Sequence, residues 1–295
     1  TYKIADQLEA EGIEAYQHQD LTLFGLHSKS YKKLPNFRNI TFLPYVARKN
    51  RNKILKPLEF YLQRHPNARF STITSGVRCT LEELPDRAKW MHRQISKCNA
   101  TKFMKDARAK FVFRSTELGE VYPLGSDGEV SCHPHCHTLL VLDRFLPKDQ
   151  WCTLLERIHG FFGTHYQDCG KIKNVRELVK YCVKPSDFEH LSSKDVVSLY
   201  HATKNLRLVE SLGSFRECKR KLKEDRMKLV RRKGVLKKVP NWVGGASVDK
   251  ATRCFQPIRE DDPEIRARLK FERMYEQRDK CISTTSAKSS RAASI

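Results

Sequence analysis

Long hydrophobic runs are absent from the sequence, and acidic residues are scarce relative to basic ones. No stretch of the 295 residues approaches the roughly 20 consecutive apolar residues that a membrane-spanning helix needs. Lysine and arginine number 56 against 34 aspartates and glutamates, which gives a formal net charge of +22. Because so large a charge repels itself in a compact chain, a polyanion is expected to share the surface. The composition therefore predicts no membrane span and favours nucleic acid as the partner over an anionic membrane surface.

Several short motifs are also missing. The ten cysteines form no CxxC pair, so a structural zinc site is not expected and the thiols are expected to stay reduced. No GxxxxGK[ST] phosphate loop occurs, which argues against a built-in helicase. The first residues carry acids and no apolar core, unlike a signal peptide. These absences favour an intracellular protein.

Residues 1–67 form a basic N-terminal region in this interpretation. Within it, residues 29–57 hold nine lysines and arginines and no acid, interleaved with aromatic residues. One reading is a solvated connector with a short strand near residues 40–43. The other is an arm that contacts DNA, with cations on phosphates and aromatics stacked on bases. In that second reading the aromatics are Tyr31, Phe37, Phe42 and Tyr45, and the candidate phosphate contacts are Lys32, Lys33, Arg48, Lys49 and Arg51.

Residues 68–217 alternate between strand and helix patterns. Strands are expected at 68–76, at 110–118 and in the apolar run after residue 137, with turn chemistry at 119–129. Helices are expected at 80–98, 147–162 and 174–187. This order predicts an α+β fold, an antiparallel sheet with helices on one face. The remaining 218–295 are expected to be a basic helical region, because 214–238 carry twelve lysines and arginines against three acids, followed by a disordered tail.

A histidine cluster stands at CHPHCHTLLVLD, residues 132–143. On a strand, His133, His135 and His137 share one face because side chains alternate with a period of two. Imidazoles two residues apart lie about 6–7 Å from one another, so their nitrogens can converge on one ion. Glu117, across the predicted hairpin, is a further candidate ligand. Two imidazoles with a carboxylate suit Mn²⁺, Mg²⁺ or Zn²⁺, whereas the alternative without a metal is a packed row of histidines.

A second candidate group lies in RELVKYCVK, residues 176–184. If this segment is helical, Glu177, Tyr181 and Lys184 form one stripe at i, i+4 and i+7. A phenol with a pKa of about 10 needs a nearby cation to act as a nucleophile. A carboxylate one turn away suits activation of water, and a lysine suits stabilisation of charge. The alternative is an ordinary amphipathic helix, and Tyr181 lies at the margin of its apolar face.

Taken in order, TITS (72–75), RSTEL (114–118), HPHCHTLLVL (133–142) and ELVKYCVK (177–184) resemble a known set. The set is similar to that of the rolling-circle replication initiators of small bacterial plasmids, a branch of the HUH endonucleases. The resemblance spans about residues 68–217, including the region 199–217 after the tyrosine. The sequence departs from the family at Cys136, where a larger hydrophobic residue is usual, and this thiol is an expected point of oxidative sensitivity.

The resemblance implies a ferredoxin-like antiparallel sheet and a single-strand DNA nickase. A divalent metal, Mn²⁺ or Mg²⁺, would be held by His135 and His137, with Glu117 or His133 completing the set. Tyr181 would attack the scissile phosphate to give a 5′-phosphotyrosine and a free 3′-OH. Glu177 would activate water at termination, and Lys184 would stabilise charge. Lys180 and Arg114, which lie inside the matching motifs, join the candidate DNA contacts.

The implied partners are single-stranded DNA or an origin hairpin, a host helicase and a DNA polymerase, with no membrane partner. The implied location is the bacterial cytoplasm, or the nucleus in a eukaryotic host. Three alternatives stay open at this point. A transposase of the same superfamily would share the site, and a histidine-triad nucleotide hydrolase would use the histidines without a metal. The third alternative is a DNA-binding protein without catalytic activity.

Overall fold

The computed structural model divides the chain into two compact units, which are described separately. The structure describes residues 1–17, 21–25, 31–34, 36–124, 129–172, 174–179, 183, 185–189, 191–225, 227–232, 234–240 and 255–257. The larger unit comprises residues 1–16 and 37–245, and the smaller unit comprises residues 17–36 and 246–295. No helix within the described ranges is both long and apolar enough to cross a bilayer.

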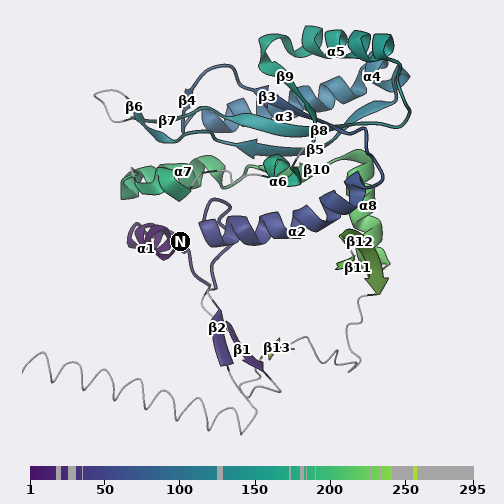
Figure 1. Ribbon diagram of the computed structural model, residues 1–295. Coiled ribbons are helices and arrows are strands. Elements are labelled where there is room, and N and C mark those ends of the chain that lie inside the picture. The colour runs from purple at the N-terminus through teal and green to yellow at the C-terminus, as the bar shows by residue number, and fades with distance from the viewer. Residues whose placement is uncertain are drawn as a thin grey trace, which may run out of the picture. The chain divides into compact units, whose positions relative to one another are not determined.

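A five-stranded antiparallel sheet forms the centre of the larger unit (Figure 1). Its strands lie in the order β10-β5-β8-β3-β9. Their bounds are β3 (Arg69–Thr74), β5 (Ala109–Glu117), β8 (His135–Leu142), β9 (Tyr166–Lys171) and β10 (Val209–Ser211). The strand expected to hold the histidines is therefore the middle one, hydrogen-bonded on both sides. The expected α+β fold, an antiparallel sheet packed against helices, is confirmed.

One face of this sheet is covered by α3 (Leu84–Ala100), α4 (Lys102–Asp106) and α5 (Lys148–Phe162). Their buried side chains include Met91, Ile95 and Ile158, which pack with Cys136 and Leu140 of β8. The helices predicted at 80–98 and 147–162 are confirmed with small shifts of their ends. Burial of such large apolar side chains contributes about 1.5–3 kcal/mol each, so this layer stabilises the sheet that carries the site.

The other face, which carries His135 and His137, is also packed beyond the histidines. Leu139 and Val141 continue that face and lie in one cluster with Leu178, Val179 and Phe215. The covering elements are α2 (Pro44–Leu62), α6 (Val175–Leu178) and α8 (Gly213–Glu224). The structure thus adds a second helical layer to the one predicted. At the histidine end of this face the His135 side chain keeps 20% exposure.

Residues 44–62 are a helix rather than the connector that the first reading of 29–57 assumed. The helix begins at Pro44, which fits the first turn because its missing N–H has no partner there. Residues 40–43 are not a strand. Phe37 and Phe42 are buried in the core of the larger unit, so stacking on bases is wrong for these two. Tyr45 packs against the same core with its ring centroid 5.6 Å from that of Phe37. Burial outweighs solvation for these rings because their neighbours are apolar.

Part of the predicted turn at 119–129 is a small antiparallel sheet. Its strands β4 (Cys79–Thr80), β7 (Glu129–Cys132) and β6 (Tyr122–Leu124) lie in the order β4-β7-β6. The turn residues of this segment gave no sign of these short strands, of which β7 pairs both with its neighbour β6 and with the distant β4. Beside this sheet in the same core cluster are buried residues of α1 (Tyr2–Ala10) and α7 (Ser193–Thr203).

The helix predicted at 174–187 is wrong in extent, because α6 ends at Leu178. Val179 leaves the helical conformation with φ −124° and ψ 69°, and a short 3₁₀ helix follows at Pro185–Glu189. Leu178 and Val179 are both buried against β8. A single helical turn has little stability of its own, so tertiary packing decides where it stops.

The basic region after Gly213 is helical in its first half alone. Helix α8 ends at Glu224, and a hairpin of β11 (Met227–Arg232) and β12 (Val235–Pro240) follows. Gly234, at φ +79°, supplies the left-handed conformation that the turn needs. The continuous basic helix predicted for 214–238 is therefore wrong beyond residue 224. The many lysines and arginines of this segment favoured the helix prediction. On each strand, however, an apolar residue (Leu229 on β11, Leu236 on β12) stands among basic ones.

The smaller unit holds a three-stranded antiparallel sheet in the order β13-β1-β2. Its strands are β1 (Leu21–Gly25), β2 (Tyr31–Leu34) and β13 (Phe255–Pro257). The segment 283–295, expected to be disordered, lies outside the described residues.

Candidate metal centre

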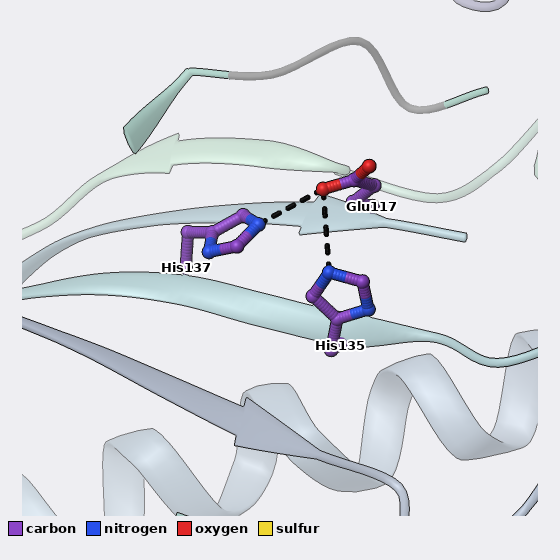
Figure 2. A group of neighbouring side chains, drawn as sticks. All are labelled: Glu117, His135 and His137. Atoms are coloured by element: carbon purple, nitrogen blue, oxygen red, sulfur yellow. Dashed lines mark hydrogen bonds and ion pairs between the residues drawn. The ribbon is translucent and has the colours of Figure 1, made fainter. Parts of the chain in front are cut away.

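Three predicted ligands come together at one end of the central sheet. The Oε2 atom of Glu117 lies 2.9 Å from Nε2 of His137 and 3.2 Å from Nε2 of His135. Figure 2 shows both imidazoles pointing toward the same carboxylate oxygen. The three potential ligand atoms all lie within 4.8 Å of one another. This is the spacing expected of groups that share one ion.

The strand register explains the convergence. Glu117, the last residue of β5, stands directly opposite His135, the first residue of β8. Residues opposite each other in an antiparallel pair project to the same face. His137 follows two residues later and so shares that face. The carboxylate therefore reaches both imidazoles without any unusual backbone conformation.

Hydrogen bonds orient both rings. Nδ1 of His135 lies 3.1 Å from the carbonyl oxygen of His133, and a carbonyl can only accept, so Nδ1 carries the proton. Nδ1 of His137 lies 3.5 Å from Oγ1 of Thr72. The ring of Phe70 packs against His137 with the centroids 5.4 Å apart. A protonated Nδ1 leaves Nε2 with its lone pair, which is the state needed to bind a metal.

The donor set fits a divalent cation. Glu117 and His137 are both 5% exposed, whereas the His135 side chain is 20% exposed. Burying a carboxylate costs several kcal/mol unless a cation or hydrogen bonds compensate it. Two imidazole nitrogens and one carboxylate oxygen leave coordination positions open for other oxygens, as expected for Mn²⁺ or Mg²⁺. Because His135 is partly exposed, those positions are accessible from its side.

His133 occupies a different position from the other two histidines. It lies between β7 and β8 rather than on the strand, and its Nε2 lies 3.0 Å from Oγ1 of Thr74. Burial lowers its pKa, as does the charge of His135. Of the two candidates for the third ligand, Glu117 and not His133 lies beside His135 and His137. A row of three histidines on one strand face, which the packed-row and histidine-triad alternatives assume, is not formed.

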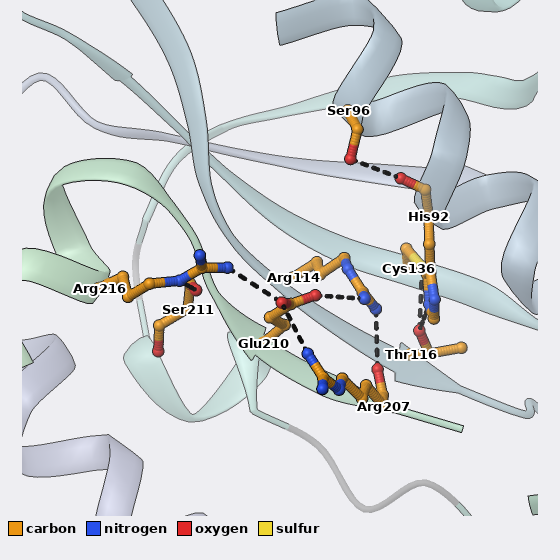
Figure 3. A network of polar contacts seen from close by, with 9 residues as sticks. All are labelled: His92, Ser96, Arg114, Thr116, Cys136, Arg207, Glu210, Ser211 and Arg216. Carbon is orange, nitrogen blue, oxygen red and sulfur yellow. Dashed lines mark hydrogen bonds and ion pairs between the residues drawn. The ribbon is translucent and has the colours of Figure 1, made fainter. Parts of the chain in front are cut away.

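Cys136 faces the opposite side of the sheet. Its Sγ lies 3.1 Å from Oγ1 of Thr116, which is 2.8 Å from Nε2 of His92 (Figure 3). The thiol is fully buried, and burial raises its pKa to about 11. A protonated, inaccessible thiol resists oxidation. The expected oxidative sensitivity is therefore wrong, and the small side chain fits between α3 and the sheet.

The second candidate group is described in part. Glu177 lies on α6 with an exposed side chain. Tyr181, Lys184 and Lys180 lie outside the described residues. Because α6 ends at Leu178, Glu177 does not belong to a continuous helix that runs to residue 184. The stripe at i, i+4 and i+7 includes residues outside the described ranges, so it stays a prediction.

The described residues on either side of Tyr181 are firmly packed. Val179 lies in the cluster that contains Leu139, two residues after His137. Val183 is buried in another cluster together with Leu118, the neighbour of Glu117. Val179 and Val183 thus pack in clusters that contain residues close in sequence to His137 and to Glu117, respectively.

The predicted DNA contacts fall into different environments. Arg48 and Lys49 lie exposed on α2, and Arg51 donates from Nη2 to the carbonyl of Arg176 at 3.2 Å. Lys32 and Lys33 belong to β2, and their side chains lie outside the described set. Arg114 is 5% exposed, so it does not lie on an accessible surface.

Arg114 binds its neighbours in the fold instead. Its Nη2 lies 2.5 Å from Oε2 of Glu210, and its Nη1 donates to the carbonyl of Arg207 at 2.8 Å (Figure 3). Arg216 also reaches Glu210, at 3.0 Å. A buried arginine with a paired carboxylate and a backbone carbonyl has its donors engaged within the protein. Arg114 on β5 therefore holds the edge strand β10, and the residues just before it, against the rest of the sheet.

Sequence reasoning did not single out Thr72 and Thr74 as partners of the histidines. Both were contained in the TITS motif, and they stand opposite His137 and His135 in the register of β3 with β8. Their alternation was visible in the sequence. What was missing was the pairing of β3 with β8, which joins residues about 60 positions apart.

An antiparallel sheet whose central strand presents two histidines to a glutamate on its neighbour defines an HUH-like metal site. Comparison with known families adds a specific match, because the family model described as a replication protein matches residues 46–239, about two thirds of the chain. The chain therefore belongs to the Rep_1 replication protein family, the rolling-circle plasmid initiators. The matched region begins in α2 and ends in β12, so it is wider than residues 68–217. Neither a curated protein nor a solved structure matches the chain.

Proposed function

We propose that the protein is a metal-dependent single-strand DNA nickase and strand transferase that initiates rolling-circle replication. The observation that carries this proposal is the convergence of Glu117, His135 and His137 in a chain of the replication protein family. The reaction is a transesterification in which Tyr181 attacks the scissile phosphate. It leaves a 5′-phosphotyrosine on the enzyme and a free 3′-OH that primes synthesis.

Glu117, His135 and His137 would hold the divalent cation, Mn²⁺ or Mg²⁺. When bound, such an ion supplies positive charge to the scissile phosphate and its oxygens. The residues of the chain then have defined tasks. His135 Nδ1 and the His133 carbonyl keep one imidazole in its tautomer, and Thr72 assists the other. Phe70 and the neighbouring strands exclude water from the His137 side.

The anchoring of the chain at Val179 and Val183 supports Tyr181 as the nucleophile. An attacking phenol must reach the scissile phosphate in line with the leaving oxygen. Val179 and Val183 are each buried two residues from Tyr181, which limits the positions available to its side chain.

Glu177 is proposed to activate water at termination, when the phosphotyrosine must be released. Its exposed side chain on α6 precedes the Tyr181 segment by a few residues and a carboxylate is a suitable general base. Lys184 and Lys180 are proposed to stabilise phosphate charge and to contact DNA. The match to the replication protein family supports these roles, since residues 180 and 184 lie outside the described ranges.

The implied partners follow from this chemistry. The substrate is single-stranded DNA or the exposed strand of an origin hairpin. A separate host helicase unwinds the duplex, and a host polymerase extends the 3′-OH. A plasmid initiator would work in the bacterial cytoplasm. A transposase would use the same site, and the match to replication proteins favours initiation.

The decisive experiment traps the covalent adduct. Labelled single-stranded oligonucleotides that tile the replicon are incubated with Mn²⁺, and adducts are resolved on denaturing gels and mapped by mass spectrometry. The wild-type chain should carry the label on Tyr181, and Tyr181→Phe should abolish it. Tyr200→Phe, on α7, is the matched control and should retain the adduct. Persistence of the adduct in Tyr181→Phe would disprove the assignment.

A second variant tests the metal ligands. Glu117→Gln keeps the shape of the side chain and removes its charge, so Mn²⁺ affinity should fall at least about 100-fold, beyond the usual cost of losing an outer-shell partner. Calorimetric titration with Mn²⁺ measures this, and adduct formation should be lost in parallel. Unchanged Mn²⁺ affinity would show that the three residues are an ion-paired cluster and not a metal site.

A further inference from the structure

A basic groove lies on the larger unit between α2, the segment 206–209 and α8. It encloses about 460 Å³, within the ~300–1,000 Å³ typical of ligand sites. Four cations line it, and amides and apolar side chains make up most of the rest. The cations and amides are Arg51, Lys53, Arg207, Lys219, Asn39 and Asn50. None of the described lining residues is acidic, so the groove attracts anions.

The cations project from three separate elements. Lys53 is exposed on α2, and the Arg207 side chain is 83% exposed. Lys219 reaches in from α8 and donates to Oγ of Ser211 at 3.1 Å. Arg207 also lies 3.9 Å from Glu210, a distance that gives a weak, solvent-screened pair. A chain of phosphates could therefore contact several of these groups at once.

The wall formed by residues 206–209 is held rigidly. Arg114 is buried beneath it and donates to the carbonyl of Arg207, while the amide of Thr116 donates to the carbonyl of Leu208 at 2.6 Å. Glu210 is fixed by Arg114 and Arg216 (Figure 3). A site whose walls do not have to be ordered on binding loses less conformational entropy. Arg114 thus serves this groove indirectly, by positioning its wall.

The groove adjoins the segment that bears the proposed nucleophile. Val179, two residues before Tyr181, is one of its lining residues. Val179 also packs in the cluster that includes Leu139 of the histidine strand. The groove thus shares Val179 with the cluster that packs on the histidine-bearing face of the sheet.

We propose that this groove binds the sugar-phosphate backbone of the single strand next to the scissile phosphate. The inference rests on the proposed nickase function and names the surface that positions its substrate. The cations and amides contact phosphates, and such contacts orient a strand without reading its sequence. The aliphatic wall of Ile54, Leu206 and Leu208 gives sugars and base edges an apolar surface.

Binding of a fluorescein-labelled (dT)20 strand tests the proposal. Measurements in EDTA by fluorescence anisotropy separate binding from cleavage. The test variant is Lys53→Gln with Arg207→Gln, and the matched control is Arg93→Gln with Lys97→Gln. The control pair is exposed on α3, which covers the opposite face of the sheet, and it removes the same charge.

The groove variant should bind roughly tenfold to thirtyfold more weakly at about 0.1 M salt. Its plot of log K against log salt should be shallower by about 1.4, because two phosphate contacts are lost at about 0.7 each. The control should stay within about twofold of the wild type. Equal losses of (dT)20 affinity in both variants would show that overall charge, and not the groove, explains binding. Unchanged affinity in the groove variant would also overturn the proposal.

Crosslinking provides a second, independent readout. A (dT)20 strand with 4-thiothymidine at single positions is irradiated, and the attached peptides are identified by mass spectrometry. Attachment within residues 50–54 or 204–211 is expected, and attachment confined to α3 would contradict it. Unlabelled (dT)20 and millimolar dTMP are also compared as competitors at equal phosphate concentration. Equal competition by the two would show a mononucleotide site instead of a strand-binding groove.

The two proposals fail in distinguishable ways. If the groove is wrong but the nickase is right, the wild type and the groove variant form the Tyr181 adduct with the same dependence on DNA concentration. If the nickase is wrong but the groove is right, no adduct forms, yet the groove variant still loses (dT)20 binding while the control does not. Mn²⁺ titration of the groove variant should match the wild type, which confirms that the fold of the site is intact.

Discussion

At the scale of the residue, the two faces of β8 have opposite chemistry. His135 and His137 present nitrogens to a carboxylate on one face, whereas Cys136 lies among buried apolar side chains and Thr116 on the other. Alternation along a strand made this division predictable from the sequence. The choice of Glu117 over His133 was not predictable, because it depends on which backbone segments pair and where β8 begins.

His92 offers a test of the buried side of this strand. Burial lowers its pKa to about 3, assisted by the charge of Arg114. The unfolded chain takes up a proton near pH 6.5, the usual histidine value, whereas the folded chain does not until about pH 3. The contribution of neutral His92 to the free energy of unfolding is therefore fully present above pH 6.5, and it is lost progressively as the pH falls toward 3.

His92→Gln keeps a polar partner for Thr116 and removes this proton. Between pH 7 and pH 4.5 the free energy of unfolding should fall in both proteins, and the fall should be smaller in the variant by roughly 1–2 kcal/mol. Urea denaturation at the two pH values measures this. His201→Gln, at an exposed position on α7, is the control and should follow the wild type. Parallel pH dependence in His92→Gln and the wild type would refute the assignment.

At the scale of the element, the connection between β5 and β7 places the site. Gly119 follows Glu117 and Leu118 with φ +69°, a conformation that glycine adopts without strain. A Cβ atom added there would approach the carbonyl oxygen of His133 to 2.7 Å. The amide of His133 in turn donates to the carbonyl of Leu118 at 2.9 Å. This close crossing of two backbones holds the end of β5 against the start of β8.

Gly119→Ala should destabilise the fold by about 1–3 kcal/mol, because it adds both backbone strain and a contact with a carbonyl that cannot rotate away. Gly160→Ala is the control of opposite sign. It lies in α5 with nothing near the added methyl group, so it should stabilise the fold by up to about 1 kcal/mol. Chemical denaturation measures both, and equal stability of Gly119→Ala and the wild type would contradict the tight crossing.

The elements also show where local sequence signals stop being sufficient. The strands β3, β5 and β8 and the helices α3 and α5 follow from periodicity, since each is long and has a clear apolar face. The early end of α6 and the short strands β6 and β7 do not. Helix α6 and strand β7 depend on distant partners, Leu139 for Leu178 and β4 for β7, and such contacts leave no regular pattern nearby.

At the scale of the whole molecule, the net charge of +22 governs both partner and stability. Some of the positive charges are neutralised within the fold, because several arginines form ion pairs with carboxylates, as Arg114 and Arg216 do with Glu210. The rest repel one another in the free protein. DNA and salt therefore both relieve this repulsion, but salt also weakens the binding of DNA.

Raising NaCl from 50 to 500 mM should increase the thermal midpoint of the DNA-free chain by about 2–4 °C, which corresponds to roughly 1 kcal/mol for a chain of this size class. Over the same range the affinity for (dT)20 should fall steeply. Scanning calorimetry and anisotropy measure the two effects. KCl at equal ionic strength controls for the identity of the cation. A midpoint that falls with salt would show that attractive surface pairs, and not repulsion, dominate.

The sequence by itself determined the chemistry available to this protein. It contains two histidines at strand spacing, a glutamate on a neighbouring strand, a tyrosine downstream and an excess of cations. Those inferences depend on periods of two to four residues and on composition, which are local properties. The tertiary structure alone decided that Glu117 joins His135 and His137, that Arg114 is buried, and that Arg207 and Lys219 line one groove. The reason is physical: these outcomes depend on strand register and burial, which arise from contacts between residues far apart in the chain.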